Sequence, residues 1–495
     1  METHYAVCCL AVVGLVVSYN FIFPAQRTTG LKTPPIIHLS DEALFRYPRQ
    51  AYESALRQYG SVIGVYRKNR LEYVVDASHT SQVLTDDALF SAERGTAAIL
   101  NFPMLNMLPT SPTVIVDKIV NKGINRVIER VISRLAPIFE RRMLKLAAQA
   151  DGATKPVPVD FLHSVHETMA QSMLLLIIGE ENPDPELIAA ALKVVQEIAT
   201  VSGLYQNIGY WSRTFPTTWR VLIWIKVIFL TIPWASRKIV RRVWKDLKQV
   251  RRTGNAEHMD PDCLLRFLIE DSRRIPGIME SISYILITFG LLFASIHQTS
   301  VIIVWVVYKM AVQKEALPAL REELSTIREF DPDSGKPTLT YASLRKAELL
   351  DSFVREVFRT KGDTLVVARL TTKDVPLGGY VVPKGSFIFP IITLSNESVE
   401  NWGEDAHKFI GDRWVGTDKT AASVSSSYWP FGLGRFACSG RYLAVAEIKL
   451  MVLNLISRVD ISMEGDKYEV IDPLNTVSVP PSGQLLLLPL EKSLF

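Results

Sequence analysis

Apolar residues recur at helical spacing along most of the chain. Spacings of three and four residues predict helices with one buried face in three long segments. These are residues 114–146, 185–202 and 278–310. Residues 61–76 instead show two short β-strand patterns around a polar turn, and strand-and-turn character returns at 375–394 and 470–490. The pattern predicts a mainly α fold with small β-sheets.

The first apolar stretch, residues 5–23, carries no charged side chain. As a helix of about 1.5 Å per residue it would be about 28 Å long, close to the hydrocarbon thickness of a bilayer. Glu2 precedes it and Arg27 and Lys32 follow it, so the positive-inside tendency places the remaining chain on the cytoplasmic side. A cleaved signal peptide is the alternative, but the basic N-terminal region that it needs is missing.

The chain shows no Gly-rich, Ser-rich or charged linker after residue 40, which favours one large domain. Pro34 and Pro35 are typical of a stiff spacer. We therefore expect an N-terminal membrane anchor at residues 1–23, a proline-containing hinge at 24–40 and a single globular catalytic domain at 41–495.

A second apolar stretch, residues 221–234, is too short to span a bilayer and is interrupted by Lys226. Residues 236–252 follow it and separate apolar from basic positions on a helix. The basic positions are Arg237, Arg241, Arg242, Lys245 and Lys248. Two interpretations remain open: contact with an anionic membrane surface, and an ordinary core helix with a solvated basic face.

Composition narrows the class of protein. Hydrophobic residues make up 48% of the 495, charged residues 21%, and the mean hydropathy is +0.15, so a large core can form and disorder is excluded. The four cysteines are too scattered for a disulfide framework or a CxxC zinc site, which favours a reducing compartment. A net charge of +4 without a dense basic stripe and interleaved aromatics does not indicate nucleic-acid binding.

One cysteine lies in a glycine-rich loop directly before a helical pattern. Residues 429–443 read WPFGLGRFACSGRYL and place Cys438 at this junction. Glycines let the backbone approach a large flat ligand and donate N–H groups to sulfur, and the N-terminus of the following helix favours negative charge. The segment is therefore a candidate site for an activated thiolate.

This loop resembles the haem-binding loop of the cytochrome P450 superfamily, with Phe431, Gly432, Gly434, Cys438 and Gly440 at the family's positions. The resemblance implies a haem b cofactor whose iron has the Cys438 thiolate as its fifth ligand. Such a thiolate donates electron density to the iron and promotes O–O cleavage. It also implies the family's triangular, mainly helical fold over residues 40 to 495.

The loop departs from the family pattern at two positions. Phe436 occupies the place where the family usually has an arginine or histidine facing a haem propionate, and Ser439 occupies a place that is often proline. Arg435, one residue earlier, is an alternative cation for the propionate, although its side chain would point differently.

Upstream, Glu356 and Arg359 resemble the family's ExxR motif on a helix. Residues 409–414, FIGDRW, resemble the element whose arginine, here Arg413, completes a buried ion network with them. The resemblance implies that this network holds the cysteine loop in shape. Taken alone, an ExxR match is more often a solvated surface pair.

Arg369 lies ten residues beyond Arg359, where family members place a propionate-binding arginine. Because two acidic propionates need cationic partners, Arg369 is the first candidate and Arg435 the second. The family's early helix often supplies a tryptophan and an arginine as well, but residues 117–130 contain no tryptophan. Possible substitutes there are Lys118, Lys122 and Arg126.

Residues 293–301, FASIHQTSV, resemble the family's oxygen-activation segment. In this register His297 takes the place of the usual acid and Gln298 that of the usual threonine, with Thr299 next. The family's acid and alcohol deliver protons through water during dioxygen activation. His297 can carry a proton and Gln298 can hold a water, whereas Thr299 lies about 100° further round the helix. A satisfied buried histidine is the alternative for His297.

The resemblance implies a monooxygenase whose electrons come from a separate NADPH-dependent cytochrome P450 reductase, because the chain has no strand-to-helix GxGxxG fingerprint of its own. The acidic docking surface of the reductase would contact basic residues on the side of the domain that carries Cys438. Candidates are Arg441, Lys118 and Lys122. For an anchored member of the family it also implies the endoplasmic reticulum membrane, crossed once, with the catalytic domain in the cytosol.

By resemblance, mainly apolar segments line the substrate pocket, which predicts a bulky lipophilic substrate. They are residues 90–112, 203–210, 292–297, 365–367 and 476–479. The segments around Gln298, Thr360 and Cys438 are similar to those of fungal enzymes that oxidise terpenoid or indole-diterpenoid intermediates of secondary metabolism. A haem-thiolate isomerase or dehydratase, which needs neither dioxygen nor NADPH, is the second hypothesis, and a non-catalytic haem or lipid carrier is the third.

Overall fold

The structure is a computed structural model of the chain, and it describes residues 32–495 apart from several short segments. The segments left out are 68–69, 100–111, 205–208, 331, 333–334, 362–367, 474–477, 492 and 495. The predicted anchor at 1–23, the first part of the hinge (24–31) and parts of the predicted pocket lining therefore lie outside the described residues.

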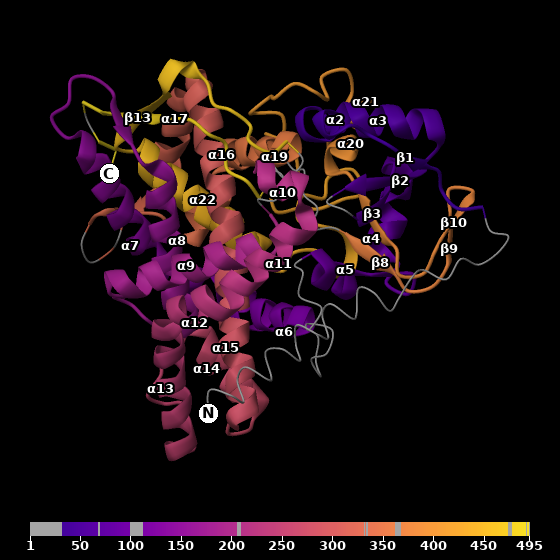
Figure 1. The fold of residues 1–495 in the computed structure, drawn as a ribbon. Helices are drawn as coiled ribbons and strands as arrows, with labels where there is room; N and C mark the ends of the chain where they lie inside the picture. The colour runs from indigo at the N-terminus through magenta and orange to yellow at the C-terminus, as the bar shows by residue number, and fades with distance from the viewer. Residues whose placement is uncertain are drawn as a thin grey trace.

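The described chain forms a triangular body with a large helical part on one side and a smaller sheet-containing part on the other (Figure 1). The helices of the first half are α2 (Asp41–Arg46), α3 (Pro48–Tyr59), α4 (Thr80–Thr85), α5 (Ala92–Ile99), α6 (Pro112–Ile119), α7 (Ile128–Ala147), α8 (Phe161–Ile178), α9 (Pro185–Val201), α10 (Tyr210–Thr214), α11 (Pro216–Lys226), α12 (Ile232–Ala235) and α13 (Arg237–Thr253). Those of the second half are α14 (Leu264–Ser272), α15 (Ile278–Leu292), α16 (Gln298–Val312), α17 (Leu317–Ile327), α18 (Tyr341–Lys346), α19 (Glu348–Lys361), α20 (Ile392–Asn396), α21 (Val399–Trp402) and α22 (Arg441–Ile456).

The strands are short. They are β1 (Ile36–Ile37), β2 (Val62–Arg67), β3 (Arg70–Val75), β4 (Phe90–Ser91), β5 (Val157–Val159), β6 (Glu329–Phe330), β7 (Pro337–Thr338), β8 (Arg369–Thr371), β9 (Val375–Leu377), β10 (Tyr380–Val382), β11 (Phe387–Pro390), β12 (Val459–Met463) and β13 (Leu485–Pro489). The prediction of a mainly α fold with small sheets is confirmed.

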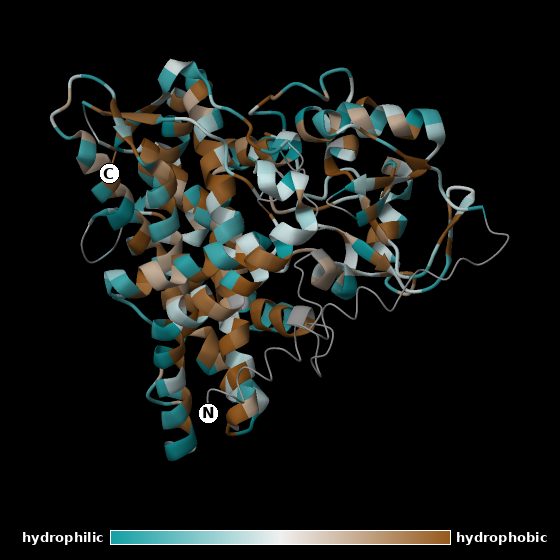
Figure 2. Cartoon of the chain, viewed as in Figure 1, coloured by the Kyte–Doolittle hydropathy of each residue, from teal (hydrophilic) through white to brown (hydrophobic). Residues whose placement is uncertain are grey.

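The core lies where α16 and α22 pass through the helical part, and hydrophobic residues concentrate there (Figure 2). Between Thr299 and Ala311 every side chain except that of Lys309 is buried, because α8, α19 and α22 pack around α16. The long helix predicted at 278–310 is present, but a π-helical turn, η7 (Phe293–His297), separates α15 from α16. Such turns often mark functional sites.

The main sheet has the strand order β1-β2-β3-β11-β8-β4. Its β2–β3 hairpin is the strand pair predicted at 61–76. On the far side of β3, β11 pairs with β8 and places Arg369 opposite Ile388. At the β1 end of the sheet, β1 pairs with β2. Because β1 lies inside the predicted hinge, the packed body begins before residue 41.

Helix α5 lies against β8 at Gly95, the residue that allows the closest approach. A Cβ atom there would lie 2.4 Å from the carbonyl oxygen of Ala368 and 2.8 Å from the Cα of Arg369. Both neighbours are backbone atoms, so they cannot rotate away. The absence of a side chain at Gly95 therefore allows α5 to pack directly against β8, the strand that carries Arg369.

We expect Gly95→Ala to lower the free energy of unfolding by about 1–3 kcal/mol, because the added methyl group forces α5 and β8 apart. Gly290→Ala is the matched control in α15, since a Cβ there meets no atom within 4 Å. That change should stabilise the helix by up to about 1 kcal/mol. Urea unfolding of both variants is the measurement, and equal effects would contradict the close packing at Gly95.

Candidate active site

The loop before α22 is closed by main-chain hydrogen bonds that place Cys438 at its end. The N–H of Cys438 donates to the carbonyl of Phe431 at 2.7 Å, and that of Ala437 donates to the carbonyl of Gly434 at 3.1 Å. Gly432 and Gly434 have φ angles of 77° and 69°, values that side-chain-bearing residues rarely adopt. These two glycines are therefore required by the loop's backbone path.

The sulfur of Cys438 lies at the N-terminus of α22, where Gly440 is the N-cap. Burial raises the pKa of the Cys438 thiol, whereas the N–H groups of Gly440 and Arg441 and the positive charge of Arg441 lower it. Cys438 nevertheless retains exposed surface. The pKa of the free thiol is raised on balance, and the N–H groups of Gly440 and Arg441 are the groups that favour its thiolate form.

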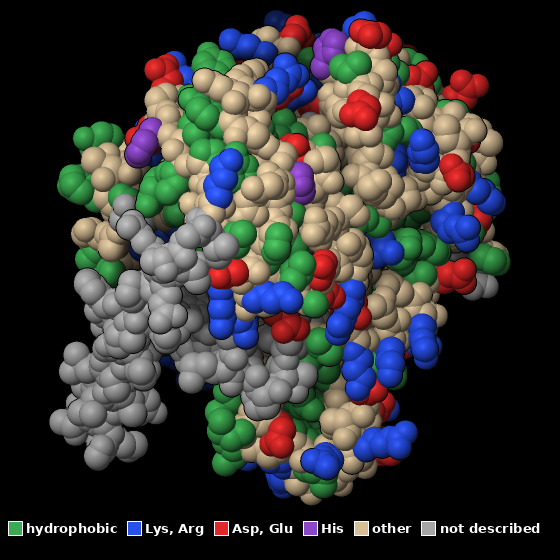
Figure 3. Space-filling model, turned by 90° about the vertical axis from the view of Figure 1, so that its right-hand side faces the viewer, with side chains coloured by type: hydrophobic (Ala, Val, Ile, Leu, Met, Phe, Trp, Pro, Cys, Tyr) green, Lys and Arg blue, Asp and Glu red, His purple; other side chains and the backbone are tan. Residues whose placement is uncertain are grey.

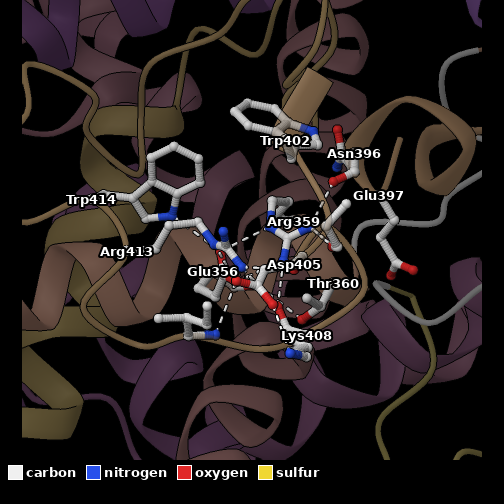
Figure 4. A network of polar contacts seen from close by, with 12 residues as sticks. Glu356, Arg359, Thr360, Asn396, Glu397, Trp402, Asp405, Lys408, Arg413 and Trp414 are labelled. Atoms are coloured by element: carbon white, nitrogen blue, oxygen red, sulfur yellow. Dashed lines mark hydrogen bonds and ion pairs between the residues drawn. The ribbon is translucent and has the colours of Figure 1, made fainter. Parts of the chain in front are cut away.

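Beside the cysteine loop, the site includes an ion network in which one carboxylate has two arginine partners (Figure 4). Glu356 accepts two hydrogen bonds from Arg359, at 2.9 and 2.7 Å, and one from Nε of Arg413 at 3.0 Å. The side chains of Glu356 and Arg359 have no exposed surface, and that of Arg413 is 15% exposed. The structure thus brings the three predicted residues together in a buried network.

Further donors complete this network. The main-chain N–H of Ile410 and the indole N–H of Trp414 each donate to Glu356 at 3.1 Å. Arg359 donates to three carbonyl oxygens, those of Asn396, Ala406 and Lys408. Because every partner comes from residues 396–414, the network fastens this segment to α19. The sequence analysis did not assign Trp414 a role, although it directly follows Arg413.

Aromatic packing connects the ion network to the cysteine loop. Phe358 lies between Glu356 and Arg359 in sequence, and its ring centroid is 4.8 Å from that of Phe431. On the other side of the loop, Asn125 donates from its amide to the carbonyl of Ser439 at 3.0 Å. The loop is therefore held from α19 on one side and from the turn after α6 on the other.

Two arginines flank the ring of Phe436. The guanidinium carbon of Arg369 lies 6.0 Å from the ring centroid, and that of Arg435 lies 5.5 Å from it. Arg369 is buried, which lowers its pKa to about 10, and the charge of Asp87 opposes this effect. The two candidate propionate partners thus lie near each other. Of the substitutes considered earlier, Lys118 forms an ion pair with Asp271, and Lys122 and Arg126 are exposed.

The turn η7 has one open face and one buried face. Ala294 is exposed although Ile296 and His297 beside it are buried. One turn earlier, a Cβ atom on Gly290 would meet nothing within 4 Å. One turn later, Gln298 is half-buried. Small residues followed by an amide thus line the face on which a flat cofactor and a substrate would have room.

His297 points away from that open face. It is 3% exposed, its ring stacks on Phe293 at 5.6 Å between centroids, and its Nε2 donates to the carbonyl of Ser478 at 3.0 Å. Burial and the charge of His166 lower the pKa of His297 to about 4, against the hydrogen bond to Ser478. At neutral pH the ring is therefore uncharged, and its Nε2–H group is occupied by the hydrogen bond to the carbonyl of Ser478.

The same serine also meets the next residue of the helix. The amide nitrogen of Gln298 donates to the hydroxyl of Ser478 at 3.2 Å. Thr299 is buried on the core side, as its position about 100° further round the helix predicts. Ser478 comes from a distant segment, and no sequence signal beyond its place in the predicted pocket lining indicated this contact.

A family model described as Cytochrome P450 matches residues 112–488 of the chain. This segment includes the cysteine loop, the ion network and the helix around η7. The chain belongs to the cytochrome P450 family. The fold agrees with this assignment: the structure titled retinoic acid bound cyanobacterial CYP120A1 superposes with a TM-score of 0.65 at 18% identity, over 93% of this chain and 100% of that chain.

Curated relatives include several fungal members of the cytochrome P450 family. Cytochrome P450 monooxygenase 151 of Postia placenta is 28% identical over 48% of this chain and 49% of its own length. Cytochrome P450 monooxygenase CYP512U6 of Ganoderma lucidum is 32% identical over 47% of each chain, and cytochrome P450 monooxygenase atmQ of Aspergillus flavus is 27% identical over 52% of this chain and 49% of its own. The matched region spans about half the length of these relatives.

Cytochrome P450s are haem-thiolate proteins, and the site residues of this chain fit that cofactor. Cys438 offers an accessible sulfur with two N–H donors. The two guanidinium groups beside Phe436 match the two carboxylates of a haem, and the open face at Ala294 leaves room for its ring. Cys438, Arg369 and Arg435 would therefore hold the cofactor.

We expect Glu356→Gln to lower the free energy of unfolding by about 3–5 kcal/mol, because it leaves the buried Arg359 and the partly buried Arg413 without their carboxylate. Arg57→Gln is the control: Arg57 pairs with Glu53 but is 79% exposed, so its loss should cost less than about 1 kcal/mol. If Glu356→Gln does not fold, Trp414→Phe removes a single donor and should cost about 1–3 kcal/mol. Similar urea unfolding of wild type, Trp414→Phe and Arg57→Gln would contradict a buried network.

A second prediction concerns pH. The unfolded chain protonates His297 near its ordinary pKa of 6.5, whereas the folded chain protonates it only near 4. Stability should therefore fall as the pH is lowered from 6.5 towards 4, by about 2 kcal/mol at pH 5 from this residue alone. His297→Gln should flatten the pH dependence of the unfolding free energy. His166, whose pKa burial also lowers to about 4, contributes to the same loss of stability, so the flattening in His297→Gln is partial. An unchanged slope in that variant would contradict the assignment.

Proposed function

We propose that this chain is a haem-thiolate monooxygenase. The observation that carries the proposal is the accessible Cys438 sulfur with its two main-chain donors, in a loop held by a buried ion network. The names of the fungal relatives, all cytochrome P450 monooxygenases, support it. Haem held by a thiolate supplies the activation of dioxygen and the transfer of one oxygen atom to an organic substrate.

The chain's own residues perform the remaining tasks. The N–H groups of Gly440 and Arg441 keep negative charge on the sulfur, and Glu356 keeps the loop in place through Arg359 and Trp414. On the opposite side, proton delivery falls to His297, Gln298 and Thr299 or to water that they hold. Gln298 is the one of the three that retains exposed surface, because His297 and Thr299 are both buried.

Electrons come from a separate NADPH-dependent cytochrome P450 reductase. The match to the family and the absence of a GxGxxG nucleotide fingerprint from the sequence support this partner. Basic residues on the cysteine side form its docking surface. Of the predicted candidates, Lys122 is exposed and Arg441 is partly exposed, whereas the charge of Lys118 is paired with Asp271.

The substrate is a bulky lipophilic molecule, a terpenoid or indole-diterpenoid intermediate of fungal secondary metabolism, that is hydroxylated, epoxidised or oxidised in several steps. The small residues on the open face at Gly290 and Ala294 and the fungal relatives support this class. The protein is anchored once in the endoplasmic reticulum membrane by residues 5–23, and its catalytic domain faces the cytosol.

A haem-thiolate isomerase or dehydratase is the second candidate. Gln298 favours it, because this residue stands where the family's proton-delivering threonine is expected and its amide is bound to Ser478. An enzyme that needs neither dioxygen nor NADPH has no use for that threonine. The two candidates share the cofactor and the cysteine ligand, so they differ only in what turnover consumes.

The first test is the carbon-monoxide difference spectrum of reduced membranes that contain wild type or Cys438→Ala. We expect a strongly red-shifted Soret band in the wild type alone, because only a thiolate ligand produces it. Wild-type protein that retains haem without this band would exclude Cys438 as the ligand. Oxygen uptake and NADPH oxidation that rise with a terpenoid substrate then support the monooxygenase, whereas product formation under anaerobic conditions without NADPH supports the isomerase.

A further inference from the structure

The C-terminal arm consists of the described residues of 469–483 and is fastened at its base to α16. Glu469 and Ser482 exchange two main-chain hydrogen bonds of 2.7 and 2.8 Å, which join the two sides of the arm before it leads into β13 (Figure 1). The hydroxyl of Tyr308, near the end of α16, donates to the carbonyl of Gly483 at 2.9 Å. The base of the arm therefore has a fixed position relative to this helix.

A second contact joins the arm to the beginning of the same helix. The Nε2 of His297, the last residue of η7, donates to the carbonyl of Ser478 at 3.0 Å. The amide nitrogen of Gln298, the first residue of α16, donates to the hydroxyl of Ser478 at 3.2 Å. These contacts lie about 16 Å from Tyr308 along the helix, at about 1.5 Å per residue. One serine thus holds the arm against the junction of η7 and α16.

The two contacts use different atoms of Ser478. His297 binds the main-chain carbonyl, which any residue at this position would offer, whereas Gln298 binds the side-chain hydroxyl. Among the described residues the amide of Gln298 is the only hydrogen-bond partner of that hydroxyl. Ser478 is 1% exposed, so water does not compete for the bond. Removal of the hydroxyl would therefore release Gln298 and leave the contact with His297 in place.

Of the three predicted proton-delivery residues, Gln298 alone combines this tether with exposed surface. Histidines lie at the surface on the face of the molecule shown in Figure 3, but His297 is 3% exposed and Thr299 is 6% exposed, whereas Gln298 is half-buried. A neutral hydrogen bond favours the held orientation of the amide by about two- to tenfold. The carbonyl oxygen and the second N–H of the amide are then fixed in position and can hold a water molecule.

We propose that Ser478 is a positioning residue that fixes the amide of Gln298, so that this amide holds the water through which protons are delivered. The inference rests on the proposed monooxygenase function. Because Ser478 is buried, it acts through Gln298 and not on the reacting molecules. A role in holding the arm alone would change stability but would not change what becomes of dioxygen.

The fate of dioxygen in the absence of substrate reports on proton delivery. A dioxygen that leaves as hydrogen peroxide takes up two electrons and two protons, supplied by one NADPH and one further proton. A dioxygen that leaves as two waters takes up four electrons and four protons, supplied by two NADPH and two further protons. The second route needs more protons, each delivered at the correct place. A displaced amide should therefore raise the share of peroxide.

The experiment uses the full chain with haem, reductase and NADPH, without substrate, and measures NADPH, dioxygen and peroxide. We expect Ser478→Ala to raise the ratio of peroxide to water by about two- to tenfold, the factor by which the lost bond loosens the amide. Ser478→Thr keeps the hydroxyl and should restore the wild-type ratio. Ser300→Ala is the matched control, because Ser300 is a buried residue of α16 whose hydroxyl has no hydrogen-bond partner in the described part of the chain.

Two further measurements test whether Ser478 acts through Gln298. Gln298→Ala should also raise the ratio of peroxide to water, and the addition of Ser478→Ala to that variant should raise it no further. Urea unfolding of the wild type, both single variants and the double variant needs no turnover. Because both single variants remove the same bond, we expect their effects on the unfolding constant to depart from additivity by about two- to tenfold.

Equal ratios of peroxide to water in the wild type and Ser478→Ala would overturn the proposal, and so would additive effects of the two substitutions on that ratio. If Ser478→Thr unfolds as the wild type does but keeps the ratio of Ser478→Ala, the effect belongs to packing and the proposal fails. When the wild type shows the red-shifted carbon-monoxide band and consumes dioxygen with NADPH, these results count against the role of Ser478 alone. A wild type without that band contradicts the proposed function itself.

Discussion

The buried carboxylate of Glu356 is the interaction on which the rest of the site depends. It accepts hydrogen bonds from Arg359, Arg413, Trp414 and the N–H of Ile410, so one residue of α19 fixes the segment that leads to the cysteine loop. A buried charge with this many donors has one favourable arrangement, because moving any partner leaves a desolvated group behind. The network therefore gives a loop without regular secondary structure the rigidity of the core.

That rigidity matters because the cysteine loop itself has few ways to hold its shape. Its glycines allow the turn, and its main-chain bonds close it, but the position of Cys438 relative to the helices comes from packing. Phe358 carries the constraint from the ion network to Phe431, and Asn125 anchors the opposite side at Ser439. The thiolate site is thus supported by two separate parts of the helical core.

The helix segment around η7 is held in place differently. Tertiary contacts there tie His297 and Gln298 to one serine, Ser478, which belongs to a segment distant in sequence. A neutral histidine locked to a carbonyl stabilises the turn η7 by its hydrogen bond rather than by its charge. Ala294 and Gln298 are left with exposed surface, whereas His297 is buried.

The sequence by itself determined the cysteine loop, the network of Glu356 with its arginines and the mainly α architecture, because each depends on short-range spacing that a local pattern records. Only the tertiary structure decided that Arg369 and Arg435 meet at Phe436 and that Ser478 binds His297. It also decided which face of α13 meets solvent. Periodicity separates apolar from basic residues on a helix, but only packing against neighbouring elements determines which of these faces is buried.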